Sequence, residues 1–424
     1  MQHHRVYILG PGSIGTFMAY GLNRGPDPPP TVLIFQDTAT ASKFNERKTL
    51  KLLTSPERPE RNVLGVVGIS VDALYYLPLT IENLVVCTKA HQTINALKSV
   101  AYRLLPTSTV LLMQNGMGLL DEIYREIWPN PALRPRIMIG INTHGVTRTS
   151  TLGVVTRNGS SGLTLSSILK DYEEQAPPGH YDLLDYTYHN KFVTRLIESP
   201  ILGAREVSYS DLLRTQVQKM VANCCINPLT AILDVPNGHM ASSKYMRRAI
   251  VAIIRETVKV LDVLPEIKAT FSTYEREGML DVAQLKEYVY SIARQTAENT
   301  SSMRADILAG RTTEIDYLNG YIAASGRKYG VQTPINSYLA HIVKHKTSSD
   351  GNDMIYSPGS VVQTILSEDR ELVTPEAEAV SEDSDPAPPE AEAGSTEDSK
   401  KVAEADDAFR EASEASEVED RSVA

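Results

Sequence analysis

A glycine-rich turn near the N-terminus constrains the fold of this chain more than any other feature. An apolar run at residues 5–10 leads into Gly10, Gly12 and Gly15, in the pattern Gly-x-Gly-x-x-Gly, and a helical pattern follows. In a dinucleotide-binding βαβ unit the first glycine permits the tight turn, the second lets the backbone approach the pyrophosphate, and the third allows close helix–strand packing. The helix N-terminus directs N–H donors toward the phosphates. We therefore predict a cofactor-binding loop made of Gly10, Pro11, Gly12, Ser13, Ile14 and Gly15.

Short apolar runs rich in β-branched residues alternate with helical stretches over the first part of the chain. The runs lie at residues 32–35, 64–71, 83–90, 108–118 and 136–146, and helical stretches include 91–105 and 118–128. This alternation favours a largely parallel, doubly wound sheet covered by helices on both faces. Two further runs, at 153–158 and 162–167, predict a hairpin that closes the domain. We assign residues 1–190 to a Rossmann-type, dinucleotide-binding domain.

From about residue 190 the pattern changes to long helical stretches, at 210–233, 244–264, 282–310 and 312–330. They predict an all-α substrate and catalytic domain over residues 191–346. Residues 347–424 are assigned to a linker and a disordered tail, because residues 367–424 carry a net charge of −15 while the rest of the chain carries +5. A tail so poor in aromatic residues cannot offset its ordering entropy. The predicted fold class is α/β: an N-terminal Rossmann-type doubly wound parallel sheet, a C-terminal all-α domain and a disordered acidic tail of unknown partner.

Composition narrows the classes of function. Hydrophobic residues make up 42% of the chain, but no apolar run approaches the ~20 residues of a membrane-spanning helix. The first predicted strand begins almost at the first residue, which leaves no room for a cleavable presequence. We expect a cytoplasmic protein with no membrane or nucleic-acid partner, and a mitochondrial location stays open. No cluster of His, Cys and Asp has metal-ligand spacing, so we predict no metal site.

Several residues of reactive type are expected to be structural. The three cysteines give no disulfide framework, and free cysteines are usually small buried hydrophobes. His144, at the end of a predicted strand, is expected to be buried and hydrogen-bonded. An apolar stripe at helical spacing in residues 250–261 is expected to be core. The residues concerned are Cys87, Cys224 and Cys225, and the stripe Ile250, Ile253, Ile254, Thr257 and Leu261.

The most informative polar pattern lies in the helical half of the chain. Lys219, Asn223 and Asn227 are spaced i, i+4 and i+8, which places one ammonium and two carboxamides in a row on one helix face. Such a row suits a small, multiply oxygenated anion better than an apolar core. Ser302 and Glu314 add further polar groups downstream. Together with the glycine loop, these residues indicate a reductase of a small keto acid.

Six separated motifs occur in the order and spacing of one family. They are GPGSIG, TKAHQ, QNGMG, GINTHGVTR, KMVANCCINPLTAILDVPNG and AENTSSMRADILAGRTTEIDYLNG. Over residues 5–345 the chain resembles the ketopantoate reductases, which reduce 2-dehydropantoate to pantoate. The motifs of the helical half are more specific than the glycine loop. The resemblance names the substrate, whereas the spacing of the polar residues alone indicates a small keto or hydroxy acid.

The resemblance implies a role for each matched residue. It makes Lys219 the proton donor, and a carboxylate such as Glu314 can orient the ammonium. In the alternative interpretation, Glu314 only stabilises a helix start beside Thr312 and Thr313. The other matched positions are Asn223, Asn227, Asn237 and Ser302, which bind the substrate, Asn115, which lies near both nicotinamide and substrate, and Lys89 and Glu314, which contact the cofactor.

The end of the second predicted strand selects between NAD and NADP, because the adenosine ribose lies there. The family commonly has an arginine there for the 2′-phosphate, whereas this chain has Gln36 and Asp37. A carboxylate accepts hydrogen bonds from a free ribose diol and repels a 2′-phosphate, although Lys43, Arg47 and Lys48 are near enough in sequence to offset that repulsion. Alternatively, Asp37 only caps the segment that follows. NADP remains the expected cofactor because of the family resemblance. NAD is the alternative, because the Asp37 carboxylate would repel a 2′-phosphate.

Three functions follow, in order of preference. The first is NADPH-dependent reduction of 2-dehydropantoate to pantoate in pantothenate and coenzyme A biosynthesis, with Lys219 as proton donor. The second is an NAD-preferring reductase or dehydrogenase of another small keto or hydroxy acid. The third is a family member of reduced turnover that acts as a regulatory or binding protein. A small-molecule keto acid is the expected partner, and a homodimer is an open possibility.

Overall fold

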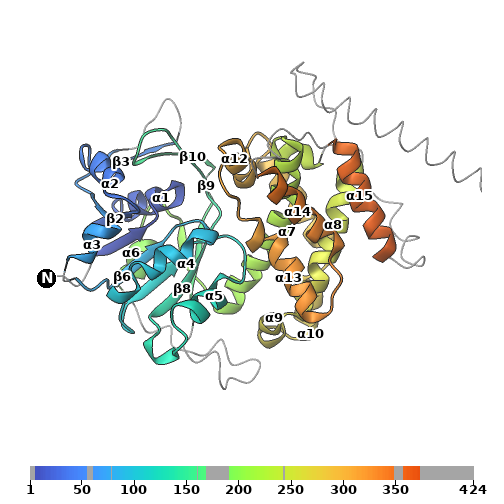
Figure 1. Cartoon of the computed structure of the whole chain (residues 1–424), viewed down its shortest axis with the longest axis horizontal. Coiled ribbons are helices and arrows are strands. Elements are labelled where there is room, and N and C mark those ends of the chain that lie inside the picture. The colour runs from blue at the N-terminus through green and yellow to red at the C-terminus, as the bar shows by residue number, and fades with distance from the viewer. Residues whose placement is uncertain are drawn as a thin grey trace, which may run out of the picture. The chain divides into compact units, whose positions relative to one another are not determined.

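The computed structural model describes residues 5–54, 61–77, 79–159, 161–168, 191–241, 244–347 and 357–372. The chain divides into two compact units, one formed by residues 1–217 with 268–275 and the other by residues 218–267 with 276–424 (Figure 1). The first unit extends past the predicted boundary at residue 190 because β12 (Ala204–Glu206) pairs in parallel with β11 (Leu163–Ile168). Residues 373–424, which make up most of the predicted linker and disordered tail (347–424), lie outside the described residues.

An eight-stranded sheet forms the centre of the first unit, in the order β12-β11-β8-β7-β6-β1-β2-β5. The strands from β5 to β8 pair in parallel, as the sequence predicts, and β11 joins β8 antiparallel. This order of parallel strands is that of the doubly wound dinucleotide-binding fold, with the direction of winding reversing between β1 and β6. The strands are β1 (Val6–Leu9), β2 (Thr31–Phe35), β5 (Val67–Ser70), β6 (Asn83–Val86), β7 (Thr109–Leu112) and β8 (Arg136–Asn142).

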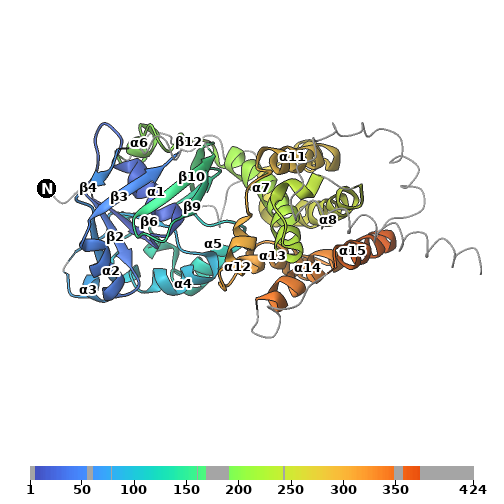
Figure 2. The same cartoon turned by 90° about the horizontal axis from the view of Figure 1, so that it is seen from above.

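Helices cover both faces of this sheet, which is why β1, β6 and β7 are buried along their whole length and are almost entirely apolar. Crossover connections are right-handed, so the helices after β1 and after β6 lie on opposite faces (Figure 2). The helices are α1 (Ser13–Leu22), α2 (Thr38–Asn45), α3 (Val71–Tyr75), α4 (Ala90–Lys98), α5 (Leu119–Glu126) and α6 (Lys191–Ile197), with short 3₁₀ turns η1 (Ala101–Arg103) and η2 (Pro131–Leu133).

A second, four-stranded sheet in the order β4-β3-β10-β9 corrects one prediction. The runs at 153–158 and 162–167 do not form a hairpin. Instead, β10 pairs with β9 and β3, while β11 pairs with β8 and β12. A hairpin would have left the edge of β8 unpaired, and open edges are unfavourable. The strands are β3 (Thr49–Leu53), β4 (Val63–Leu64), β9 (Gly145–Arg148) and β10 (Val154–Gly159).

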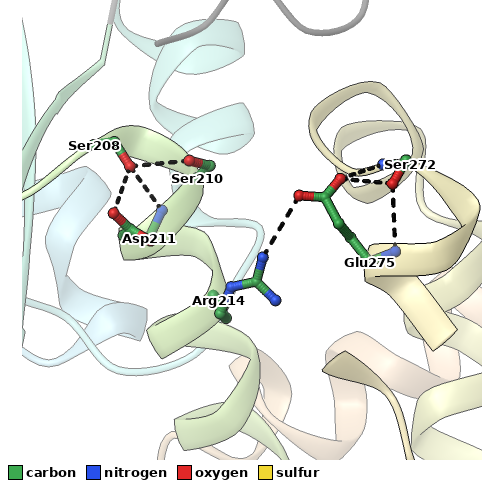
Figure 3. Close-up of polar contacts among 6 residues, drawn as sticks. All are labelled: Ser208, Ser210, Asp211, Arg214, Ser272 and Glu275. Atoms are coloured by element: carbon green, nitrogen blue, oxygen red, sulfur yellow. Dashed lines mark hydrogen bonds and ion pairs between the residues drawn. The ribbon is translucent and has the colours of Figure 1, made fainter. Parts of the chain in front are cut away.

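Helix α7 (Tyr209–Leu233) contains the boundary between the units, and its first turn is capped by its own side chains. Ser208 Oγ accepts from the Asp211 N–H at 3.1 Å and donates to Asp211 Oδ2 at 2.8 Å (Figure 3). At the start of α10 (Thr273–Met279), Ser272 N–H donates to Glu275 Oε2 at 2.9 Å and Glu275 N–H donates to Ser272 Oγ at 3.3 Å. The start of α10 is therefore a capping box, whereas at α7 only the Asp211 N–H is satisfied by the serine.

Arg214 explains why residues 268–275 cluster with the first unit. Its Nη2 lies 3.9 Å from Glu275 Oε1 (Figure 3), and its guanidinium lies 4.9 Å from the centroid of the buried Phe271 ring. A cation over an aromatic face adds an attraction beyond the ion pair. The first half of α7 therefore binds this returning segment through one arginine.

The second unit is helical and is built around α8 (Lys244–Val263). The predicted stripe from Ile250 to Leu261 is fully buried, which confirms it as core. The predicted stretch 282–310 is interrupted, because Thr296 ends one helix and the Ser301 hydroxyl caps the next by accepting from the Arg304 N–H. The remaining elements are η3 (Asn237–Ala241), α9 (Pro265–Thr270), α11 (Val282–Gln295), α12 (Ser302–Leu308), η4 (Ile315–Tyr317), α13 (Asn319–Tyr329) and α14 (Pro334–Lys346).

A further helix, α15 (Pro358–Leu372), lies in the segment that the sequence assigns to linker and tail. Val361, Val362 and Ile365 are buried, and α15 packs on α8 and α14. Asp369 forms an ion pair of 3.1 Å with Arg255 of α8. The helical unit thus extends beyond residue 346, because this short amphipathic stretch gains burial only by packing on other helices. In the described part of the chain, no helix has the length and apolar character required to cross a bilayer.

Candidate functional site

The three glycines of the predicted cofactor loop meet different requirements. A Cβ on Gly10, which has φ +83°, would lie 2.7 Å from Thr88 Cγ2, and a Cβ on Gly15 would collide with the Gly10 carbonyl oxygen. A Cβ on Gly12 would meet no atom of the described residues within 4 Å. Gly12 also begins α1 without a side-chain cap. Gly10 and Gly15 are therefore fixed by packing, while Gly12 leaves open space at an uncapped helix start, which fits a pyrophosphate.

The predicted cofactor residues follow neighbouring strands of the main sheet. Gly10 follows β1, Asp37 follows β2, Lys89 follows β6 and Asn115 follows β7. Because these strands are parallel, their carboxyl ends lie at one edge, on both sides of the point where the winding reverses. Lys89 and Asn115 are both partly exposed there. The fold thus brings together every cofactor residue predicted in the first unit.

Asp37 caps helix α2. Its Oδ1 accepts from the Thr40 N–H at 2.7 Å and its Oδ2 accepts from the Thr40 hydroxyl at 2.9 Å. These two bonds hold the pKa of the Asp37 carboxyl below its usual value, so the group is a carboxylate at neutral pH. The predicted cap is therefore present, and it leaves a negative charge at the edge where the adenosine ribose is expected.

Gln114, which the sequence analysis did not single out, lies at the same edge. Its Nε2 donates to the carbonyl oxygens of Val86 at 2.9 Å and Thr88 at 3.2 Å, which ties the end of β7 to that of β6. Since both partners are acceptors, the orientation of the amide is fixed. Its Oε1 is buried and makes no hydrogen bond with the described residues. The only sequence signal was its place beside Asn115 in the QNGMG motif.

Helix α7 presents the predicted row of Lys219, Asn223 and Asn227. Lys219 and Asn223 are partly exposed and Asn227 is buried. Burial lowers the pKa of Lys219 to about 8, and the negative charge of Glu314 opposes this shift. Glu314 is buried at the start of η4 and makes no side-chain capping bond there. Glu314 thus lies at a helix start, as the alternative interpretation requires, and its charge also acts on Lys219.

Asn237 is held with one end of its amide free. Its Nδ2 donates to Thr296 Oγ1 at 3.0 Å, and the Thr296 hydroxyl donates in turn to the Ile292 carbonyl at 2.7 Å. Because Thr296 has already used its proton, the amide must face it with the NH₂ group. Asn237 Oδ1 is consequently a buried acceptor with no partner among the described residues. Such an acceptor needs a donor, for example the hydroxyl group of a ligand.

Ser302 is the exposed first residue of α12, and its neighbour Ser301 is buried. Ser301 caps α12, and its hydroxyl is hydrogen-bonded at 2.7 Å to the hydroxyl of Thr230, one turn beyond Asn227 on α7. The two adjacent serines therefore have different roles. Ser301 fixes the helix start to α7, and Ser302 is left accessible.

The residues expected to be structural behave accordingly. Cys224 and Cys225 are fully buried, Cys87 packs against the core of the sheet, and burial raises the pKa of all three thiols. His144 is buried, with Nε2 2.8 Å from the Leu202 carbonyl and Nδ1 accepting from the Ser161 N–H at 3.1 Å. These predictions are confirmed for His144, Cys224 and Cys225, whereas Cys87 is only partly buried. Among the described residues, no group of three or more His, Cys, Asp and Glu side chains could hold a metal ion.

A doubly wound sheet with a glycine loop at its reversal point is typical of NAD(P)-dependent oxidoreductases. The chain belongs to the ketopantoate reductase family. The family described as ketopantoate reductase PanE/ApbA matches residues 6–169, and its C-terminal part matches residues 211–347.

Individual proteins support this assignment. A protein of Schizosaccharomyces pombe named "Probable 2-dehydropantoate 2-reductase" is 30% identical over 355 residues, covering 81% of this chain and 97% of its own. A D-mandelate dehydrogenase solved with NADH and anilino(oxo)acetate has a TM-score of 0.64 at 22% identity, covering 81% of this chain and 98% of its own. A dimeric ketopantoate reductase of Staphylococcus aureus has a TM-score of 0.58 at 18% identity, covering 82% and 100%. At these identities the two structures show a shared fold.

Proposed function

We propose that this protein reduces 2-dehydropantoate to pantoate with NADPH, as a step toward pantothenate and coenzyme A, and that it does so in the cytoplasm. The relative in Schizosaccharomyces pombe carries the name of that reaction. The observation that carries the proposal is the row on α7. It combines a lysine whose pKa is about 8 with two asparagines on the same face and a carboxylate acting on the lysine.

Lys219 has the properties of a general acid for this reaction. When bound, NADPH supplies the hydride that reduces the C2 carbonyl carbon. As the carbonyl π bond breaks, negative charge grows on the oxygen, and the Lys219 ammonium stabilises it and donates the proton. A pKa near the working pH favours this transfer, which contributes ~10²–10⁴-fold to the rate. Glu314 orients the ammonium and keeps Lys219 largely protonated at neutral pH, because its charge opposes the lowering of the pKa.

The amides provide binding without a competing charge. Ketopantoate has a carboxylate, a carbonyl and a terminal hydroxyl. We assign the carboxamide NH₂ groups of Asn223 and Asn227 to its anionic oxygens, because an amide N–H donates to a carboxylate without adding charge and both residues lie on the helix face of Lys219. Asn237 Oδ1 is assigned to the hydroxyl, since this buried acceptor requires a donor. Ser302 adds an accessible hydroxyl at the start of α12.

The cofactor residues follow the edge of the sheet. We assign the pyrophosphate to the loop from Gly10 to Gly15, and the nicotinamide side to Lys89 and Asn115, with Glu314 as a further contact. Asp37 raises NAD as the alternative to NADP, and the D-mandelate dehydrogenase of the same fold was solved with NADH. This favours, as a second candidate, an NAD-preferring reductase of another small keto acid. The structural relative from Staphylococcus aureus is dimeric, which supports a homodimer here.

One assay separates these functions. We expect the purified protein to oxidise NADPH in the presence of ketopantoate, with a higher kcat/KM than with NADH or with related 2-keto acids that lack the terminal hydroxyl. A preference for NADH with another keto acid would select the second candidate. No turnover of any of these substrates, with NADPH binding retained, would select the regulatory or binding protein.

A further inference from the structure

Helix α7 contains a proline in the part that bears the asparagines. Pro228 has no N–H, so the carbonyl of Cys224, four residues earlier, has no donor within the helix, and the proline ring crowds the same carbonyl. Cys224 is fully buried, where an unpaired carbonyl is costly. The disturbed turn, residues 224–228, begins directly after Asn223 and contains Asn227. The carbonyl and proline at the two ends of this turn lack the usual helical hydrogen bond, so the local geometry here affects how the two asparagines are directed relative to one another.

Asn319, the first residue of α13, supplies the missing donor. Its Nδ2 lies 3.0 Å from the Cys224 carbonyl oxygen and donates to it. The second hydrogen of the same NH₂ group is donated to Asn336 Oδ1 at 2.9 Å. Both partners are acceptors, so the orientation of the amide is fixed, and Asn319 Oδ1 makes no hydrogen bond with the described residues. The contribution of this fully buried side chain thus lies in its two donated bonds.

The bond to α7 is anchored in two other helices. Asn336 Nδ2 donates to Glu256 Oε1 at 2.8 Å, and the N–H groups of Ile335 and Asn336 donate to the two oxygens of the same carboxylate at 2.9 and 2.7 Å. Glu256 of α8 thereby caps the start of α14, where a negative charge is favoured. A fully buried network of directional bonds runs from α8 and α14 through Asn319 to the Cys224 carbonyl of α7.

We propose that Asn319 is a positioning residue, which replaces the hydrogen bond that Pro228 removes and so fixes the directions of Asn223 and Asn227. The inference rests on the proposed function, in which these two asparagines bind the keto acid. Asn319 lies only five residues after Glu314. One short segment therefore acts on α7 at two points, by charge at Lys219 and by a hydrogen bond at Cys224.

The hydrogen-bond replacement is tested by thermal unfolding, without any assay of turnover. Asn319→Leu should lower the Tm by about 3–8 °C, because it leaves the buried Cys224 carbonyl without a donor. In a Pro228→Ala background the same substitution should lower the Tm by less than half as much, since the alanine introduced there provides an N–H to that carbonyl. Equal shifts in both backgrounds would overturn the inference. Asn319→Ser, which is smaller and polar, replaces Asn319→Leu if the latter does not fold.

The positioning role is tested by kinetics. Asn319→Leu should raise the KM for ketopantoate about tenfold, with kcat within about threefold, the KM for NADPH unchanged and the pH profile of kcat retained. In the double variant with Pro228→Ala the Tm should recover but the KM should not, because a straightened helix misdirects Asn227. The matched control is Val289→Ala, a buried residue of α11 outside this network, which should lower the Tm with no change in KM.

An unchanged KM for ketopantoate in Asn319→Leu, with only the Tm lowered, would mean that the residue is merely structural. Failure of the proposed function has a different signature. In that case the wild-type protein does not reduce ketopantoate, but Asn319→Leu still lowers the Tm less in the Pro228→Ala background than in the wild type.

Discussion

At the scale of single residues, Lys219 bears most of the proposed chemistry. We expect Lys219→Ala to lower kcat at least ~10²-fold while leaving cofactor binding and the fold nearly intact, because the proton is needed only at the transition state. Steady-state kinetics and NADPH titration measure the two effects separately. A variant that keeps more than a tenth of the wild-type kcat would exclude general acid catalysis by this lysine.

The pH dependence of Lys219 has opposite consequences for turnover and stability. Its pKa is lowered from 10.5 to about 8 in the folded protein, chiefly by burial. Reduction needs the ammonium, so kcat should fall as the pH rises through about 8. Between pH 8 and 10.5 the unfolded chain binds more protons at this site than the folded one, so this group makes the folded state more stable as the pH rises. Chemical denaturation across this range should show the trend in wild type and its loss in Lys219→Met.

Asp37 combines a structural role with an electrostatic one, which two substitutions can separate. A carboxylate ~4–6 Å from a 2′-phosphate costs on the order of 1–3 kcal/mol at an effective dielectric constant near 20. Asp37→Arg should therefore raise kcat/KM for NADPH and lower it for NADH, with about 1 kcal/mol of stability lost because the cap of α2 is removed. Asp37→Asn keeps a good cap without the charge, so it should improve NADPH use without that loss. An unaltered NADPH/NADH ratio in both variants would assign Asp37 to capping alone.

At the scale of elements, α15 extends the described helical unit to Leu372. Its three buried apolar side chains contribute about 4.5–9 kcal/mol at most, from ~1.5–3 kcal/mol for each buried side chain. Truncation after residue 372 should leave the Tm and turnover unchanged, because the acidic remainder buries little surface. Truncation after residue 357 should lower the Tm by many degrees. A large loss on removing only the residues after 372 would show that the tail docks on the folded part.

The elements themselves divide into those that local pattern determines and those that it does not. The almost entirely apolar runs that become β1, β6 and β7 predict buried parallel strands, because only strands covered on both faces lack polar positions. The runs that become β10 and β11 resemble each other, so the local sequence does not tell which strand each one pairs with. Their partners are determined by which strands have a free edge: β10 pairs with β9, and β11 pairs with β8. Helix α15 was missed since its apolar residues form one short stretch, whose burial depends on α8. The pairing of β10 and β11 and the burial of α15 depend on tertiary packing, which a short window of sequence does not contain.

At the scale of the whole molecule, the site was predictable where its residues lie on one element. The spacing of Lys219, Asn223 and Asn227 defines a helix face by itself, and the cofactor loop is recognised from its glycine motif alone. Asn319 and Gln114 were not predictable, because each acts on a carbonyl far away in sequence, at Cys224 and at Val86. Backbone carbonyls leave no trace in a sequence. Supporting residues of this kind appear only when the fold shows which carbonyls lack a donor.

The empty space beside Gly12 makes it possible to obtain an inactive protein that is still properly folded. A methyl group there meets no described atom, and the φ of −76° is one that alanine adopts freely. We expect Gly12→Ala to keep the wild-type Tm but to lose the rise in Tm that NADPH causes, while Gly15→Ala, which collides with Gly10, should unfold more easily. A cell that carries Gly12→Ala in place of the wild type contains the polypeptide without its chemistry. If that cell grows only when pantothenate is supplied, the cell requires the catalytic activity of the protein. If it grows normally without pantothenate, the protein has a function in the cell that does not depend on catalysis.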